Sequence, residues 1–337
     1  MTPLGAVLIL VPLLLGPLVI RALERNLEGF CLVLGLIAAT LAGWNRALVA
    51  EAALAPAPVT IAVLIAGLGF AHLRPALARG FGRLRETTSR PLLTAVTVIA
   101  IGFASSLITA VVGGLLLVEA IGMLRLGPPA RNNVTVAGCF AIGIGSALTP
   151  AGGPFSAIVA QGLDLRFGDL FILLGAWMVP AVVGLGMLAA WFARGDYDLI
   201  AEESSVHERP SDVIRQGAKV FAFVAGLALI GAACAPLAAV WVPHFGPGLL
   251  FWGNTLSAAL DNATLAALES HAVTPLHLRP ALVSMAVSGG MLIPGNIPNI
   301  VCAGILRIGS ADWARVGVPI GLVMLGISFA ILVVGGA

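Results

Sequence analysis

Charge is scarce in this chain: Asp, Glu, Lys and Arg make up only 10% of its 337 residues, whereas 59% are hydrophobic. A water-soluble domain carries about 25% charged residues, so this composition excludes one. The apolar runs are long and unbroken and lack the period-two alternation of a membrane β-barrel. The composition therefore predicts an all-α polytopic membrane protein whose surroundings are the lipid bilayer.

Several function classes lack their motifs here. The sequence has no GxxxxGK[ST] loop for nucleotides, no GxSxG nucleophile elbow and no HExxH zinc motif, so we predict neither an enzyme nor an ATP-driven pump. It predicts no nucleic-acid partner and no resident cofactor. The four cysteines stand apart without a CxxC or a histidine partner, which is typical of packed free thiols. No basic segment precedes the first apolar run, which we interpret as a membrane helix and not as a cleaved signal.

A membrane crossing needs about 20 apolar residues. By that measure the predicted crossings are residues 4–20, 29–50, 57–78, 133–164, 169–193, 217–243, 278–307 and 313–335. Two further apolar segments, 91–126 and 245–270, either cross the membrane or enter it and return as re-entrant hairpins. Both contain polar residues near the middle.

The basic residues favour the hairpins. If both segments are hairpins and the N-terminus lies outside, all of the 18 Lys and Arg residues except Arg46, Arg166 and Arg279 are cytoplasmic. If both segments cross, the basic residues divide almost evenly between the two sides. Because positive charge in short loops favours the cytoplasm, we predict eight crossings in the cell membrane, with both termini outside.

This topology divides the chain into two inverted-topology repeats. Residues 1–55 form two lead-in helices, 56–194 the first repeat, 195–216 a cytoplasmic linker and 217–337 the second repeat. Each repeat is predicted to contain a helix, a re-entrant hairpin, a broken transmembrane helix and a further helix. Since each repeat crosses three times, the second enters from the opposite side.

The two broken helices carry the strongest functional signal. One break spans Gly145–Ser156 and the other Gly289–Ile300. Their prolines match at one offset, Pro150 and Pro154 in the first and Pro294 and Pro298 in the second. Unwound backbone in hydrocarbon is tolerated only where it is buried in protein or lines a polar cavity. Matching breaks in two halves therefore point to a transporter's binding site. Proline kinks that neighbouring helices satisfy are the alternative.

Asp261 is the strongest single candidate, because a carboxylate in the apolar run 256–267 is costly and marks an ion or proton path. A hard cation such as Na⁺ prefers oxygen ligands, and one carboxylate can bind Na⁺ and H⁺ alternately. A capping aspartate near a hairpin turn is the alternative. The predicted ion- or substrate-binding residues are Asp261, Asn262, Asn254, Thr255, Ser105, Ser106, Thr149, Gly152, Gly153, Ser156, Gly295, Asn296 and Asn299.

For two glutamates, the sequence allows either a functional or a structural role. Glu119 is either an auxiliary proton-coupling group beside Asp261 or a residue at a helix end. Glu269 is either functional or, because Ser270 and His271 follow it, a group at the membrane interface.

Three motifs, at 146–154, 256–264 and 289–299, resemble the ion transporter superfamily. It includes NhaD-type sodium/proton antiporters, arsenite permeases and divalent-anion/sodium symporters, and the chain is most similar to a small branch of cation transporters. The resemblance implies hairpins that meet broken helices at mid-membrane, elevator-like alternating access and a homodimer. It also implies that Asp261 and Asn262 form a Na⁺ site.

The predicted function is a secondary active transporter, a Na⁺(Li⁺)/H⁺ antiporter in which Asp261 is the exchange carboxylate. One alternative is a Na⁺-coupled symporter or efflux permease for a small oxyanion or carboxylate. The other is an ion channel, although paired breaks favour alternating access over a continuous filter.

Overall fold

The chain is an all-α protein with an apolar exterior, as a membrane protein requires. The computed structural model describes residues 2–20, 22–23, 26–54, 56–57, 60–61, 64, 84, 87–194, 210–241, 244–259, 262–269 and 275–334. No β-strand occurs among them. Four of their helical stretches are long and apolar enough to cross a membrane: Arg90–Ile108, Asp169–Phe192, Gly217–Leu237 and Ser310–Leu332. The predicted count of eight crossings and the predicted sidedness stay predictions.

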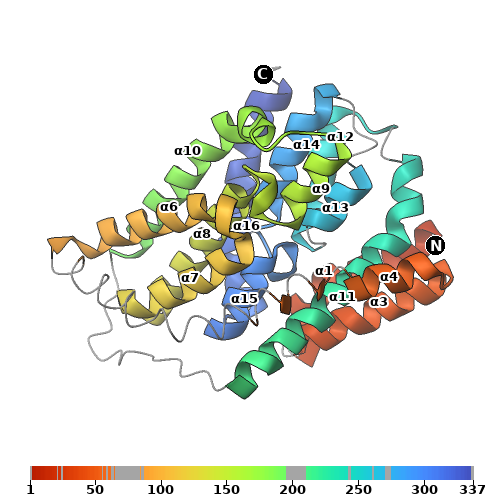
Figure 1. Cartoon of the computed structure of the whole chain (residues 1–337), viewed down its shortest axis with the longest axis horizontal. Coiled ribbons are helices and arrows are strands. Elements are labelled where there is room, and N and C mark those ends of the chain that lie inside the picture. Colours follow the sequence, from red (N-terminus) through yellow and green to blue (C-terminus); the bar gives the residue numbers. More distant parts are fainter. Residues whose placement is uncertain are drawn as a thin grey trace.

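Helices α1 (Pro3–Val19), α3 (Leu27–Ala42), α4 (Arg46–Leu54) and α11 (Pro210–Trp241) lie together on one side of the molecule (Figure 1). Helix α11 packs along α3 and α4, and its Lys219 Nζ lies 2.8 Å from Glu28 Oε1 of α3. This group touches the other helices chiefly through α11. We call α1, α3, α4 and α11 the scaffold and the remaining helices the bundle.

The second predicted crossing, 29–50, is two helices in the structure. Gly43 ends α3 with a left-handed φ of 85°, which glycine adopts without steric cost. The side-chain oxygen of Asn45 then accepts a hydrogen bond of 2.9 Å from the Leu48 N–H and starts α4. The turn at Gly43 and Asn45 therefore divides a segment that its hydropathy predicts to be one helix.

Helix α11 begins at Pro210, inside the range predicted as a linker. Proline suits the first turn of a helix, because its missing N–H would be unpaired there in any case. Residues 195–209 of that predicted linker lie outside the described residues, as does most of the predicted crossing 57–78.

Segment 91–126 forms two helices, α6 (Arg90–Ile108) and α7 (Ala110–Leu124), which pack against each other. The chain reverses at Thr109, whose φ of 75° ends α6. Segment 245–270 is also divided: α12 (Pro247–Gly253) runs into a 3₁₀ turn, η3 (Asn254–Ala258), and α13 (Asn262–Glu269) follows.

Both predicted breaks interrupt a helix. Helix α8 (Pro128–Ser146) is followed by the short turn η1 (Pro150–Gly152) and then by α9 (Pro154–Gly162). Helix α14 (Pro275–Ser288) is followed in the same way by η4 (Ile293–Gly295) and α15 (Ile297–Leu306). The breaks predicted from the proline spacing are therefore confirmed as interruptions of helical structure.

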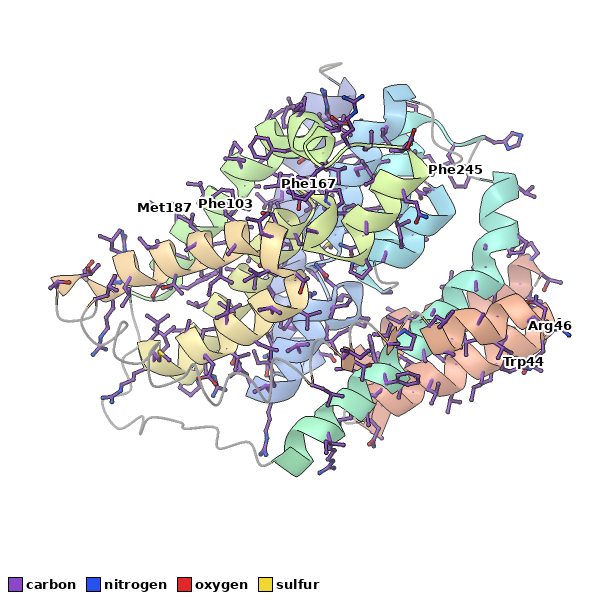
Figure 2. The ribbon with its side chains drawn as sticks, viewed as in Figure 1. Trp44, Arg46, Phe103, Phe167, Met187 and Phe245 are labelled. Atoms are coloured by element: carbon purple, nitrogen blue, oxygen red, sulfur yellow. The ribbon has the colours of Figure 1, made fainter. Side chains whose placement is uncertain are left out.

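A long helix follows each interrupted one. Helix α10 (Asp169–Phe192) packs against α6 and α8, and α16 (Ser310–Phe329), which continues as a π-helical turn (Ala330–Val334), packs against α14. Large apolar side chains cover the outside of the bundle, and Phe167 and Met187 are more than half exposed (Figure 2). Trp44 and Arg46 lie close together at one end of the scaffold (Figure 2). Exposed apolar helix faces suit contact with lipid.

Candidate functional site

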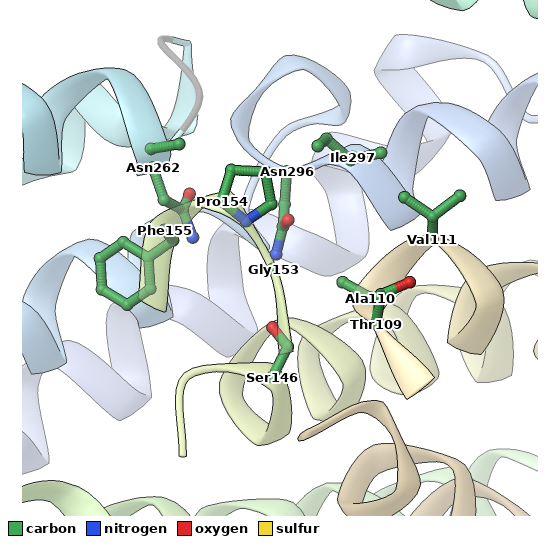
Figure 3. A pocket seen from close by; sticks show the side chains of 11 residues that line it. Thr109, Ala110, Val111, Ser146, Gly153, Pro154, Phe155, Asn262, Asn296 and Ile297 are labelled. Atoms are coloured by element: carbon green, nitrogen blue, oxygen red, sulfur yellow. The ribbon is translucent and has the colours of Figure 1, made fainter. Parts of the chain in front are cut away.

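A small cavity lies where the two interrupted helices and the two divided segments meet (Figure 3). Its volume is about 30 Å³, which is room for a small ion or a few water molecules. The lining residues are Thr109, Ala110, Val111, Ser146, Gly153, Pro154, Phe155, Asn262, Ala263, Asn296 and Ile297. They come from four stretches of chain that are far apart in the sequence.

Four helices begin at this cavity. Helix α7 starts at Ala110, α9 at Pro154, α13 at Asn262 and α15 at Ile297, and all four residues line it. The first N–H groups of a helix have no intrahelical acceptor, and a helix N-terminus carries the equivalent of about half a positive charge. Two helices end there: Ser146 is the last residue of α8, and Thr109 directly follows the last residue of α6. Because four helices begin and two end at the cavity, the partial charges of the backbone there are positive on balance.

Thr109 holds an unusual backbone conformation at this cavity. Its φ of 75° lies in the left-handed region, which is a clear outlier for a β-branched residue. Its side chain caps α7, accepting a hydrogen bond of 3.5 Å from the Val112 N–H. Strained backbone of this kind costs about 1–3 kcal/mol and gathers at binding and catalytic sites.

Two asparagines of the second half, Asn262 and Asn296, line the cavity. Asn262 is 2% exposed, and its Oδ1 is buried without a hydrogen-bond partner. That oxygen packs so closely on Gly289 that a β-carbon there would overlap it. The side chain of Asn296 packs in the same way on Gly143 of α8. An unpaired buried carboxamide costs about 1–3 kcal/mol, which a bound ion or water would relieve.

The first break is held by hydroxyl groups. Thr149 donates a hydrogen bond to the carbonyl of Ser106, near the end of α6, and so joins the break to the neighbouring helix pair. Ser146 donates to the Gly143 carbonyl at 2.9 Å, and Ser156 donates to the Gly153 carbonyl at 3.1 Å. The bonds to Ser106 and Gly143 satisfy carbonyls near the ends of α6 and α8, whereas the Gly153 carbonyl also accepts from the Ala157 N–H.

The second break is held by an amide and an indole. Asn299 Nδ2 donates to the carbonyls of Gly289 and Leu292, both at 2.8 Å, and Trp313 Nε1 of α16 donates to the Gly290 carbonyl at 3.1 Å. Asn299 and Trp313 are fully buried. Three unwound carbonyls thus have protein donors, as backbone at membrane depth requires.

Of the predicted site residues, Gly153, Asn262 and Asn296 line the cavity. Asp261 lies outside the described residues, although it immediately precedes the lining residue Asn262 in the sequence. Gly152 and Gly295 end the two 3₁₀ turns. The predicted residues that support the breaks from behind are Thr149, Ser156 and Asn299.

The other predicted residues lie away from the cavity lining. The hydroxyls of Ser105 and Ser106 donate to carbonyls of their own helix, Ile101 at 2.7 Å and Phe103 at 2.7 Å. Thr255 likewise donates to the carbonyl of Trp252 at 2.7 Å.

Asn254 and the two open glutamates also lie away from the lining. Asn254 is buried and donates to the Ala281 carbonyl at 3.2 Å and to Ser284 Oγ at 3.1 Å. Glu119 lies partly buried on α7. Glu269, for which a place at the membrane interface was one expectation, is only 5% exposed.

A family model described as "Protein of unknown function (DUF1646)" matches residues 4–334. The chain belongs to the DUF1646 family. No curated protein matches this DUF1646 chain. The matched region includes both interrupted helices and every residue that lines the cavity.

Sequence reasoning missed Thr109, Ser146 and Phe155 as lining residues of the DUF1646 cavity. Thr109 carried a usable signal, since a threonine in the middle of an apolar run of 36 residues is a plausible helix cap. Ser146 also carried a signal in the sequence, because it follows Gly145 at the start of the first break. Phe155 carried none, because an aromatic residue after a proline is common in any apolar helix.

Asn299→Ala is expected to destabilise the second break, because the Gly289 carbonyl would lose its donor and the Leu292 carbonyl would keep only the Gly295 N–H, at 3.3 Å. The expected loss is about 1–3 kcal/mol of unfolding free energy. Thermal unfolding of the protein in detergent measures it. Asn26→Ala is the matched control, because Asn26 precedes α3, is exposed and makes no capping bond, so its loss should be within about 0.5 kcal/mol. Equal effects of the two variants would contradict this role of Asn299.

Proposed function

We propose that this DUF1646 protein is a secondary active transporter that carries a small ion across the membrane by alternating access. The observation that supports the proposal is a cavity at which four helices begin and the two interrupted helices meet. Irregular backbone in a membrane protein is tolerated where it lines such a cavity. Binding sites of secondary transporters are built from interrupted helices in this way.

The order of elements supports two related halves. Helices α6 and α7 form a pair, an interrupted helix follows, and α10 completes the first half. The segment α12–η3–α13, the interrupted helix α14–α15 and α16 follow the same order in the second half. Each half packs against the interrupted helix of the other half: α7 packs on α15, and α13 packs on α9. This arrangement is what two inverted repeats around a central site would produce.

Re-entrant hairpins are part of this proposal. Helix α6 has 19 residues, about 28 Å, and could span a bilayer by length alone. The hairpin interpretation rests on the distribution of the basic residues and on the reversal of the chain at Thr109, beside the cavity. The scaffold of α1, α3, α4 and α11 would then stay fixed while the bundle moves, as in an elevator.

Sodium/proton exchange is the first form of the proposal. Asp261 would supply the carboxylate that binds the cation, and the unpaired Oδ1 of Asn262 would supply a neutral oxygen ligand. Carboxylate and amide oxygens suit a hard cation. Among the residues described in space, His, Cys, Asp and Glu form no group of three that could hold a metal ion. Asp261 would therefore be the central charge for a cation.

A Na⁺-coupled oxyanion carrier is the second form, and the electropositive cavity favours it. Four helices begin at the cavity, and helix N-termini favour oxyanions and carboxylates. Each helix end is worth about half a charge, so the four N-termini and the C-termini of α6 and α8 together leave about one positive charge for an anion. The anion would then occupy the cavity, and the coupling cation would bind beside it, at Asp261.

The stabilisation of the purified protein by ions tests the proposal. An ion that binds the folded protein at 100 times its dissociation constant adds about 2.7 kcal/mol of stability. We expect NaCl, LiCl or a phosphate or sulfate salt to raise the melting temperature, with KCl and choline chloride as references. Asn262→Ala should remove most of the rise, whereas Asn26→Ala should keep it. If no salt stabilises the wild type, or if both variants keep the rise, the proposed site is wrong.

A further inference from the structure

A ladder of buried polar side chains runs from the cavity along the face between α13 and α14. On α13, Asn262 and Glu269 are seven residues apart, so they share one face of the helix. On α14, Ser284 and Ser288 are four residues apart and share another. Helix α13 packs against α14 and η3, and η3 packs against α14.

Glu269 is the acidic member of this ladder. It is 5% exposed, and the side chain of Asn254 in η3 lies beside its carboxyl. Asn254 donates to Ser284 Oγ at 3.1 Å, and η3 is further tied to α14 by Ser257, which donates to the Met285 carbonyl at 3.0 Å. A buried carboxyl thus lies next to polar side chains that are bonded to the helix entering the second break.

Three atoms of the ladder are buried without a partner: Asn262 Oδ1, Ser288 Oγ and Glu269 Oε2. Each unpaired group costs about 1–3 kcal/mol in a packed interior. Three such groups on two helices that pack together are not explained by packing alone. Water molecules and a proton that can leave and return would satisfy all three.

Among the described side chains, no cation forms an ion pair that would hold Glu269 in the ionised form. The charged or titratable residues with described side chains on the packed elements are Arg215, Lys219 and Cys234 of α11 and Arg279 of α14; α9 and η3 carry none. No ion pair joins any of these to Glu269, and Lys219 pairs with Glu28 instead. The side chains of Asp212 and His277 lie outside the described part of the chain. Glu269 is also the last residue of α13, where the helix dipole disfavours a carboxylate.

We propose that Glu269 is the proton-carrying acid of the transport cycle and exchanges its proton through this ladder with the cavity. This inference rests on the proposed transporter function. In one state the carboxyl is protonated and neutral; in the other it has released the proton, as H₃O⁺, to water in the cavity and is a carboxylate. If the bound ion is a cation, its entry favours release of the proton; if it is an anion, its entry favours uptake. By linkage, the affinity for the ion then varies with pH by up to about tenfold per pH unit for one proton.

Ion binding as a function of pH tests the inference. Binding of radiolabelled Na⁺ and, in a second arm, of radiolabelled phosphate is measured on the purified full chain from pH 5 to pH 9. We expect Glu269→Gln to bind the ion with an affinity that no longer changes with pH, and Glu269→Asp to retain the pH dependence with a shifted midpoint. Asp312→Asn, an exposed acid that pairs with Arg315, is the control and should behave as wild type.

Infrared spectroscopy of the same samples keeps the test independent of binding. The carbonyl stretching band of a protonated carboxyl group should titrate in the wild type and in Asp312→Asn and should be absent from Glu269→Gln. An unchanged band, or an unchanged pH dependence of binding in Glu269→Gln, overturns the role of Glu269. If neither ion binds to the wild type at any pH, the proposed transporter function fails instead.

Discussion

Gly152→Ala is expected to prevent the first break from forming, whereas Gly153→Ala should leave the fold intact and block the site. A β-carbon at Gly152 would overlap the carbonyl oxygen of Ser146, which is backbone and cannot rotate away. The strain should cost about 3 kcal/mol or more, so little folded protein should remain. Yield after size-exclusion chromatography and the melting temperature in detergent measure this.

The neighbouring glycine has room for a methyl group. Gly153 has an extended backbone, with φ 165°, and its one neighbour within 4 Å among the described residues is Ala110, at 4.0 Å. Both residues line the cavity of about 30 Å³. Gly153→Ala should therefore fold as wild type but lose about tenfold or more in ion affinity, because the methyl group takes up space in the cavity. If both variants fold and transport alike, the close packing of the first break is not as described.

Asp261→Asn is expected to abolish coupling in a protein that still folds. Asp261 is the acid that directly precedes α13, one of the four helices that begin at the cavity. A carboxamide has nearly the same shape as a carboxylate but carries no negative charge to bind a cation. If the ion is a cation, its affinity should fall by at least about tenfold, which corresponds to about 1.4 kcal/mol. If the ion is an anion, its binding should survive while the dependence on Na⁺ is lost.

This second variant separates the two forms of the proposal. Proteoliposomes that hold a pH-sensitive dye show whether added Na⁺ or Li⁺ moves protons, and radiolabelled phosphate shows whether Na⁺ drives uptake. Glu28→Gln, which replaces an acid in the scaffold far from the breaks, is the control. If Asp261→Asn transports both ions at the wild-type rate, Asp261 is not part of the site.

The sequence predicts the interruptions of the helices well because they depend on local chemistry. Proline lacks an N–H and glycine allows close approach, so Pro150, Pro154, Pro294 and Pro298 mark the breaks whatever surrounds them. The sequence predicts a re-entrant hairpin at 91–126; in the structure this segment is two helices that meet at Thr109, and its re-entrant path stays a prediction. The division of 29–50 was missed, because a long apolar run outweighed the short signal of Gly43.

The composition of the site was harder to predict because it depends on which helix ends meet. Asn299, Thr149 and Asn254 are polar residues in apolar segments, and for that reason each resembled an ion ligand in the sequence. In the structure, they donate hydrogen bonds to carbonyls of the breaks or of neighbouring helices. A polar side chain that satisfies unwound backbone and one that binds an ion give the same sequence pattern. Only their positions in space separate them.

Ion flux into proteoliposomes tests the central claim, that the cavity between the breaks binds the transported ion. Wild type, Gly153→Ala and Asn26→Ala are reconstituted, and the initial rates for Na⁺, Li⁺, K⁺, phosphate and sulfate are measured against concentration. We predict saturable flux of Na⁺ and Li⁺ or of one oxyanion in the wild type and in Asn26→Ala, reduced at least about tenfold in folded Gly153→Ala. Flux that does not saturate, or that is equal in all three proteins, would contradict the claim.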